Sequence, residues 1–280
     1  MSETISPATR GLNYHLYLDD SGSRMLNRLS VDADAWPQWF ALGGLLIKEE
    51  DEEACKAAHD AFYARWPNMT GPLHLTDMLA SRKKFAWLGN LDEAQAAVFW
   101  RDFHDVLSGL PVIAQACVVH RPGYRDRGYG SRVGDAKWDL CRTAFNILIE
   151  RCAKIAATEG RRLRVKYEGS DRAADHALRS YWALLKAANG LGFNADNASK
   201  YNPFPADKLA GTLIDMERKT KQSKILQFAD TFVLTISRGR YQPNFPTFLA
   251  VKAAGLISDD VVGSKRAGTE GVKFSCFDNL

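Results

Sequence analysis

The sequence predicts an α/β protein in which a mixed β-sheet is flanked by α-helices. Segments rich in β-branched and aromatic residues alternate along the chain with segments whose apolar residues recur at helical spacing. One segment, residues 39–48, is almost continuously apolar, which is typical of a strand covered on both faces. The composition, 46% hydrophobic and 25% charged, is that of a globular protein. We expect a single domain over residues 1–280, with a core at about 12–240 and a C-terminal extension at 241–280.

The first elements follow from local composition. Residues 12–19, Leu-Asn-Tyr-His-Leu-Tyr-Leu-Asp, predict a strand that stops at a Ser-Gly-Ser turn. Residues 24–37 would form a short edge strand or a loop before the apolar strand at 39–48. Apolar residues at helical spacing then predict helices at 50–65 and 91–107.

The middle of the chain continues the alternation. β-branched residues predict a strand at 112–120, and a loop rich in glycine and arginine follows over 121–134. An apolar stripe predicts a long helix at 136–158. A strand at 161–168 and a helix at 173–188 come next.

The last predicted elements are a strand at 211–216 and a helix at 225–237, which Gly239 would end. After Pro243 we expect irregular structure, with residues 258–280 only partly ordered. No internal repeat and no linker rich in proline and serine interrupts the chain, which favours one domain.

Charge, cysteines and hydropathy narrow the class of protein. The 37 basic and 33 acidic residues give a net charge of +4, too small to establish a nucleic-acid partner by itself. The five cysteines are odd in number and scattered, so they favour reduced thiols over a disulfide framework or a zinc site. The N-terminus lacks the apolar run of a signal peptide, and no stretch reaches the roughly 18 apolar residues of a membrane span. We expect a cytoplasmic protein without membrane contact.

Several motifs of phosphate and acyl chemistry are absent from the sequence. It contains no G-x-x-x-x-G-K-[ST] and no G-x-S-x-G, which excludes the common P-loop and serine-hydrolase sites. Aspartyl-phosphate phosphatases need D-x-D after a strand, and here Ser21 stands two positions after Asp19. An actin-like nucleotide-binding fold would need a duplicated half, and the chain has no repeat.

Carboxylates inside apolar segments are the informative acids, because an ionised acid is costly to bury unless it is paired or bound to metal. Asp19 and Asp20 end the first strand, where they could hold Mg²⁺ or form an Asp-Ser-Gly turn. Glu168 ends a later strand, and a solvated strand end is its alternative. Asp230 interrupts a helix that is apolar nearly all round, so it needs a metal or a buried cation as partner. Acids on separate elements suit two-metal phosphodiester chemistry, with ions about 4 Å apart.

Three short motifs carry a resemblance to a known family. Residues 17–22 read Tyr-Leu-Asp-Asp-Ser-Gly, residues 165–168 read Val-Lys-Tyr-Glu, and residues 226–230 read Leu-Gln-Phe-Ala-Asp. They resemble the Y-x-D-E-S-G opening, the strand ending in glutamate and the L-Q-x-A-D helix start of a large bacterial family called domain of unknown function 3800. The similarity is spread over residues 14–237, nearly the whole core.

The resemblance implies an RNase H-like fold and nuclease activity. The family is regarded as RNase H-like, and its members often lie beside mobile elements and phage-defence genes. Carried over residue by residue, the resemblance implies Asp19, Glu168 and Asp230 as ligands of Mg²⁺ or Mn²⁺. Asp20 stands where the family's motif has glutamate, so the second acid of the motif has a shorter side chain here.

His74 and Asp77 are secondary candidates for the same site. They lie in His-Leu-Thr-Asp, shortly before the basic triplet at 82–84. His74 could act as a general base or contact a phosphate near the metals, and Asp77 could be a fourth acid. The alternative is an exposed histidine beside a helix-capping aspartate.

Positive charge is concentrated in three segments, residues 121–142, 151–166 and 217–224. Basic residues interleaved with aromatic ones suit a groove that follows a nucleic-acid backbone, and ordinary solvated faces are the alternative. The last segment directly precedes the helix of Asp230. We therefore expect it to contact nucleic acid through its four cations, Arg218, Lys219, Lys221 and Lys224.

The working hypothesis is a Mg²⁺- or Mn²⁺-dependent nuclease. Asp19, Glu168 and Asp230 would hold the metals, with Asp20 and His74 as further catalytic candidates. The alternative is a catalytically silent module that binds nucleic acid or a partner protein in a phage-defence or mobile-element context. RNA and DNA both stay open as substrates, as do internal and terminal cleavage, and a core of this size is compatible with a homodimer.

Overall fold

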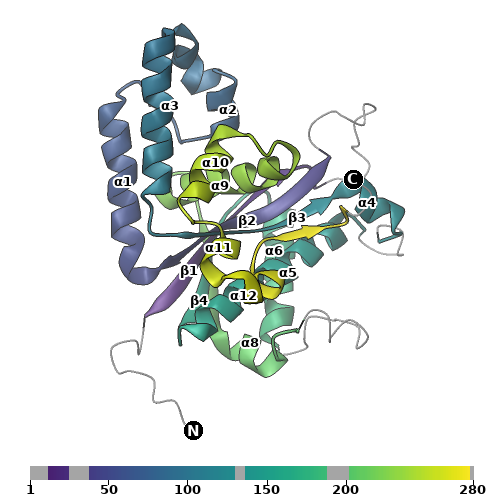
Figure 1. The fold of residues 1–280 in the computed structure, drawn as a ribbon. Helices are drawn as coiled ribbons and strands as arrows, with labels where there is room; N and C mark the ends of the chain where they lie inside the picture. Colours follow the sequence, from purple (N-terminus) through teal and green to yellow (C-terminus); the bar gives the residue numbers. More distant parts are fainter. Residues whose placement is uncertain (1–11, 25–37, 130–135, 188–201, 278–280) are drawn as a thin grey trace.

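The structure is a computed structural model that describes residues 12–24, 38–129, 136–187 and 202–277. Its centre is a six-stranded sheet in the order β5-β4-β1-β2-β3-β6 (Figure 1). The strands are Asn13–Gly22 (β1), Trp39–Lys48 (β2), Ile113–His120 (β3), Arg162–Glu168 (β4), Leu213–Lys219 (β5) and Lys273–Ser275 (β6). β2 pairs antiparallel with β1 and β3, whereas β4 is parallel to β1 and β5, and β6 is parallel to β3. The predicted mixed sheet is confirmed.

Helices cover both faces of this sheet, as predicted. They are α1 (Glu52–Arg65), α2 (Leu75–Leu79), α3 (Glu93–Ser108), α4 (Arg121–Asp126), α5 (Ala136–Thr158), α6 (Arg172–Lys186), α8 (Ala206–Thr212), α9 (Lys224–Tyr241), α10 (Pro246–Ala253), α11 (Ser258–Val262) and α12 (Ser264–Glu270), with 3-10 helices η2 (Glu49–Asp51) and η3 (Lys83–Asn90). α1, α3, α9 and α10 pack on one face, and α5, α6 and α8 pack on the other (Figure 1). Within the described ranges, no helix combines the length and apolar character needed to span a membrane.

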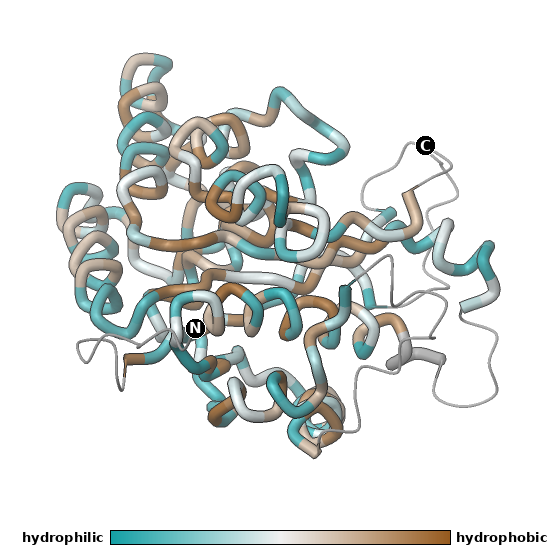
Figure 2. The backbone as a smooth tube through the Cα atoms, turned by 60° about the horizontal axis from the view of Figure 1, so that its bottom comes forward, coloured by the Kyte–Doolittle hydropathy of each residue, from teal (hydrophilic) through white to brown (hydrophobic). Residues whose placement is uncertain are grey.

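Side-chain alternation along β1 divides the interior into two apolar layers. Tyr17 packs with α1 and α9 on one face, whereas Leu16 and Leu18 pack with α5 on the other. Figure 2 shows hydrophobic segments through the middle of the molecule, with hydrophilic segments toward the outside. Because Asp19 follows Tyr17 by two residues, alternation turns it toward the layer that contains α9.

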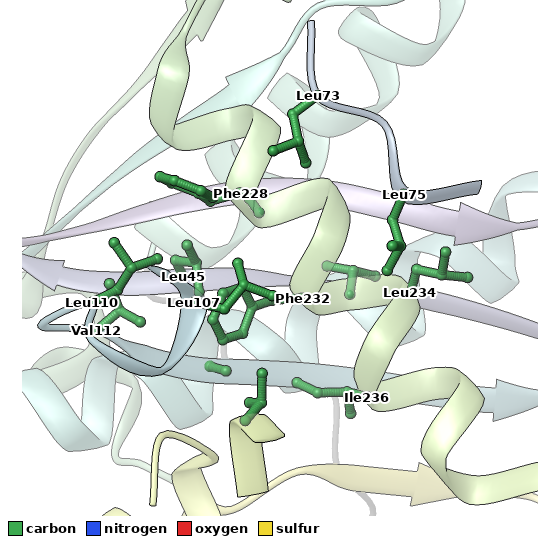
Figure 3. Packing of buried hydrophobic residues seen from close by; sticks show 14 of the residues in the cluster. Leu45, Leu73, Leu75, Leu107, Leu110, Val112, Phe228, Phe232, Leu234 and Ile236 are labelled. Atoms are coloured by element: carbon green, nitrogen blue, oxygen red, sulfur yellow. The ribbon is translucent and has the colours of Figure 1, made fainter. Parts of the chain in front are cut away.

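α9 is the central helix of its layer. Thirteen of its 18 residues are buried. Figure 3 shows Phe228, Phe232 and Ile236 spaced along the helix over the strands. The expected helix, apolar nearly all round, is confirmed, and Asp230 lies half-buried within it.

The predicted end of this helix at Gly239 is wrong, because α9 continues to Tyr241. A Cβ atom on Gly239 would lie 2.3 Å from Cδ2 of Phe248 in α10. The glycine therefore permits the close approach of a second helix. From the sequence, the position of Gly239 just after the apolar stripe is compatible with a helix cap as well as with a helix–helix contact.

Gly239→Ala is expected to destabilise the protein by about 1–3 kcal/mol through overpacking, although alanine is the better helix former by about 1 kcal/mol. Gly268→Ala in α12 is the matched control, because an added Cβ there has no atom within 4 Å. That variant should be neutral or slightly stabilised. Urea unfolding of both variants decides the matter, and a stabilised Gly239→Ala would show that the two helices can separate without loss.

The region after Pro243, expected to be irregular, contains three helices and completes the sheet. β6 pairs with β3 from Cys117↔Lys273 to Val119↔Ser275. Nearby, the fully buried Gln115 donates from Nε2 to the Glu270 carbonyl at 2.6 Å. Short elements of this kind are stabilised by distant partners, which local composition does not reveal. α8, before β5, was missed for the same reason.

A buried polar cluster lies on β1 and β4 beneath the start of α1. Lys166 Nζ is 2.7 Å from Glu52 Oε1 and 3.0 Å from His15 Nδ1. The Tyr17 hydroxyl donates to Glu52 at 2.6 Å. Burial alone would raise the pKa of Glu52, but hydrogen bonds from His15, Lys166 and Tyr17 outweigh it and hold that pKa well below its usual range. The cluster ties α1 to the sheet two residues before Asp19.

Candidate functional site

β1 and β4 place two of the predicted acids side by side. The strands are parallel, with Tyr17 opposite Lys166 and Leu18 opposite Tyr167. Asp19 and Glu168 are the next residues on each strand. Leu18 and Tyr167 face the layer of α5, so alternation directs both acids toward α9.

The third acid comes from α9, which packs across β1 and β2. Asp19, Asp20, Glu168 and Asp230 all line one open pocket of about 460 Å³. His74 and Asp77, the secondary candidates, line the same pocket. The structure thus brings together every acid selected from the sequence, although the elements that supply them are far apart along the chain.

The acids in this pocket disfavour one another's ionised form. Burial, the Asp230 charge and the Asp20 charge raise the pKa of Asp19 well above its usual range. Burial also raises the pKa of Asp230 to about 6, although nearby His74 and the backbone of Leu75 act to lower it. Oδ2 of Asp230 is buried without a hydrogen-bond partner among the described residues. A cation bound in this pocket would relieve both the repulsion and the unsatisfied oxygen.

The lining of the same pocket also carries positive charge. Lys83, Lys84 and Lys221 line it together with His74. Lys221 Nζ lies 3.4 Å from Glu168 Oε1. The pocket therefore combines acids from the sheet and α9 with cations from neighbouring segments.

Asp77 holds two cations beside this pocket. It is 5% exposed and accepts hydrogen bonds from Arg82 Nε at 2.5 Å and Lys83 Nζ at 3.0 Å. Burial acts to raise the pKa of Asp77, but these cations and His74 lower it to about 2. His74 Nδ1 lies 2.8 Å from Asp77 Oδ2, without the alignment of a hydrogen bond. Asp77 thus pairs with cations and does not cap a helix. His74 is the N-cap residue of α2, but its side chain makes no capping hydrogen bond.

Gln227 is a positioning residue that the sequence analysis did not select. Its Oε1 accepts from the Leu73 backbone N–H at 2.8 Å, and its Nε2 donates to the Lys221 carbonyl at 3.1 Å. His59 Nε2 lies 3.0 Å from the same Oε1. This one amide therefore holds both segments that flank Asp230. The only signal in the sequence is its place in Leu-Gln-Phe-Ala-Asp, three residues before the acid.

Asp20 forms an ion pair with Arg24 through Nε and Nη2 of the arginine. Asp20 also lines a smaller, mainly apolar pocket with Phe40 and Leu42 on the α5 side of the sheet, and Asp19 and Glu168 line that pocket as well. Within the described residues, Asp19 and Asp230 are thus the acids of the site without an ion pair, whereas Asp20 has one.

The donor set of the pocket fits a hard divalent cation, because carboxylate oxygens are the ligands that Mg²⁺ and Mn²⁺ prefer. In the described part of the chain, however, no group of three His, Cys, Asp or Glu side chains stands in a geometry that could hold a metal ion. The residues fit by chemistry and by the unsatisfied oxygen of Asp230.

The four cations predicted to contact nucleic acid do not form one surface. Lys221 alone lines the acidic pocket. Lys219 pairs with Glu217, and Lys224 pairs with Asp60 on α1. Arg218 and Lys219 are adjacent residues of β5, so their side chains lie on opposite faces of the sheet. Arg218 pairs with Asp175 of α6 on its face. The four residues are therefore divided between the two faces of the sheet, and their contact with nucleic acid stays a prediction.

Within the segment at 151–166, the cations are mainly structural. Arg151 donates to the Gly271 and Gly268 carbonyls. Arg161 pairs with Glu50, and Lys166 belongs to the buried cluster. The segment at 121–142 lies partly outside the described residues, as do the loop predicted at 24–37 and the end of the helix predicted at 173–188.

Comparison with known proteins places the chain beside one bacterial relative. It is 30% identical over 267 residues to "Uncharacterized protein y4pM" of Sinorhizobium fredii (strain NBRC 101917 / NGR234), and the match covers 94% of each chain. The chain belongs to the family of that protein. No family model matches the chain, and no solved structure matches it. The shared length means that the family extends over both layers of the sheet and the candidate site.

Proposed function

We propose that this protein is a nuclease of RNase H-like fold that hydrolyses phosphodiester bonds of RNA or DNA. Mg²⁺ or Mn²⁺ would be held by Asp19, Glu168 and Asp230. The observation that carries the proposal is the single pocket in which acids from β1, β4 and α9 meet, with Asp230 Oδ2 buried and unpartnered among the described residues. The resemblance of the three motifs to domain of unknown function 3800 supports the same assignment.

The sheet supports the fold part of the proposal. β1, β2 and β3 form an antiparallel unit, and β4 and β5 extend it in parallel beyond β1. This order and these strand directions are what we would expect of an RNase H-like sheet, in which the central first strand carries an acid. Here that strand carries Asp19, and its parallel neighbour carries Glu168.

The acids and the cations of the pocket would have separate parts in hydrolysis. Bound divalent ions would activate water and stabilise the attacking and leaving oxygens. The three acids supply the negative charge that retains such ions. Lys84 and Lys221 would supply positive charge for the phosphate oxygens. His74, half-exposed and beside Asp77, would accept or donate a proton in the same pocket.

The proposal is tested by incubating the protein with labelled single-stranded RNA and DNA, both duplexes and the hybrid, in Mg²⁺, in Mn²⁺ or in EDTA. We expect cleavage of at least one substrate in metal, none in EDTA and none with Asp19→Asn. Asp105→Asn, which neutralises an exposed acid on α3, is the control and should cleave normally. Cleavage that survives EDTA or Asp19→Asn would refute the metal–carboxylate mechanism.

A second candidate is the catalytically silent binding module. The ion pair of Asp20 with Arg24, and the absence of a preformed metal group among the described residues, favour it. On this assignment the protein binds nucleic acid equally in Mg²⁺ and EDTA, and Asp19→Asn binds as the wild type does. The same substrates serve as binding probes, so one set of reagents separates the two functions.

A further inference from the structure

A second pocket opens where the chain leaves β4 and enters α6. Its volume is about 440 Å³, and its lining consists of Ser170, Arg172, Asp175, His176, Arg179 and Arg218. It lies outside the acidic pocket and shares no lining residue with it. Glu168, however, precedes Ser170 by two residues, about 7 Å of extended chain. The two pockets therefore adjoin the carboxyl end of β4 on opposite faces of the sheet.

The charge of this second pocket is strongly positive. Three guanidinium groups and one imidazole face a single carboxylate, and that carboxylate is already engaged. Asp175 Oδ1 accepts from the Ser170 backbone N–H at 3.1 Å, and Oδ2 accepts from Arg218 Nε at 2.7 Å. Asp175 is 9% exposed, so it anchors Arg218 from below. Arg172 and Arg179 have no ion-pair partner within the described ranges.

Gly169 lets Arg218 lie across this entrance. A Cβ atom at residue 169 would be 2.1 Å from Arg218 Nε and 2.3 Å from its Cζ. The guanidinium is thus held between a buried carboxylate and a residue without a side chain. A planar guanidinium with one edge on Asp175 keeps its remaining N–H groups for another acceptor.

We infer that this basic pocket binds a phosphate group of a nucleic-acid strand that continues past the acidic pocket. The inference rests on the proposed function for the position of that strand. Arginine forks match phosphate oxygens bidentately, and two of these arginines have no competing carboxylate among the described residues. The phosphate is either an internal phosphodiester or a terminal 5′-phosphate.

The test measures binding alone, in EDTA, by fluorescence anisotropy with a labelled 12-nucleotide single strand of RNA or DNA. Arg172→Gln/Arg179→Gln is expected to weaken binding by at least about 10-fold and to flatten the dependence of affinity on salt. Arg101→Gln/Lys252→Gln removes the same charge from exposed positions on α3 and α10, outside the three basic segments, and should weaken binding less than about 2-fold. Equal losses in the two double variants, or no binding by the wild type, would overturn the inference.

Gly169→Ala provides a test at constant charge. The added Cβ atom displaces the Arg218 guanidinium, so we expect the variant to bind the oligonucleotide several-fold more weakly. If only the net charge of the protein mattered, the variant would bind as tightly as the wild type. Oligonucleotides with and without a 5′-phosphate show which phosphate the pocket binds. A pocket for the terminal phosphate would bind the phosphorylated strand more tightly, whereas a pocket for an internal phosphodiester would bind both strands equally. Cleavage in Mg²⁺ is measured in a separate experiment. Failure of the proposed nuclease function would appear as absent cleavage, whereas failure of this inference would appear as unchanged binding by Arg172→Gln/Arg179→Gln.

Discussion

Asp230→Asn is expected to raise the stability of the metal-free protein by about 2 kcal/mol at pH 7 and to lower metal-dependent cleavage roughly 1000-fold. Burial raises the pKa of Asp230 to about 6, so the ionised acid is unfavourable in the folded protein. A shift of that size corresponds to about 3 kcal/mol, reduced because the side chain is only half-buried. The same acid would hold a metal worth several kcal/mol in the transition state. The site would thus lower stability in return for activity.

The pH dependence provides a direct test. An acid with a raised pKa lowers stability progressively as pH rises from its unfolded pKa, near 4, to its folded pKa, near 6. The advantage of Asp230→Asn in EDTA should therefore shrink to less than half at about pH 4.5. Urea unfolding at the two pH values measures it, with Asp105→Asn as the control. Mg²⁺ should stabilise the wild type more than the variant, and a variant less stable than the wild type at pH 7 would contradict the charge-repulsion account.

Glu52→Gln is expected to destabilise the protein by about 3–5 kcal/mol at pH 7, because it leaves Lys166 buried without a carboxylate. The side chains of Glu52 and Lys166 are 13% and 9% exposed, and their atoms lie 2.7 Å apart. Glu52→Gln/Lys166→Met should recover most of the loss, since it removes the unpaired charge as well. Thermal and urea unfolding of the single and double variants measure this coupling.

Glu53→Gln is the matched control, because the neighbouring acid is 84% exposed and pairs only with Lys56 among the described residues. It should change stability by less than about 0.5 kcal/mol. The depressed pKa of Glu52 also fixes the pH window. Its contribution is complete above the unfolded pKa of glutamate, about 4.3, and is lost as pH falls below it. The gap between Glu52→Gln and the wild type should therefore narrow in acid, and a constant gap would mean that the loss is not electrostatic.

Asp19, Glu168 and Asp230 could be selected from the sequence because two of them end predicted strands and the third interrupts an apolar helix. Burial of an acid is costly whatever the topology, so that signal is local. Their meeting in one pocket depends on the parallel pairing of β1 with β4, which joins residues about 150 positions apart. No local pattern contains that register. The sequence therefore predicted the members of the site but not their arrangement.

The cations were predicted less well, for a physical reason. Lys166 and Arg161 appeared as part of a basic segment, yet their partners Glu52 and Glu50 lie more than 100 residues away. Arg218 was grouped with Lys219 and Lys221, but alternation along β5 sends Arg218 and Lys219 to opposite faces, and Lys221 follows the end of the strand. A run of charged residues in the sequence therefore predicts a charged surface only when the secondary structure and the distant ion-pair partners are also known.

The pairing of β6 with β3 has a consequence for folding in the cell. All eight residues of β3 are buried, and without β6 its outer edge would offer unpaired backbone groups to other chains. The strand that covers this edge, β6, follows β3 by about 150 residues and is therefore synthesised long after it. A chain that stalls or is cut before β6 would carry an apolar, open edge and be prone to aggregation. Loss of β6 would thus lower the yield of soluble protein, although none of its residues lines the candidate site.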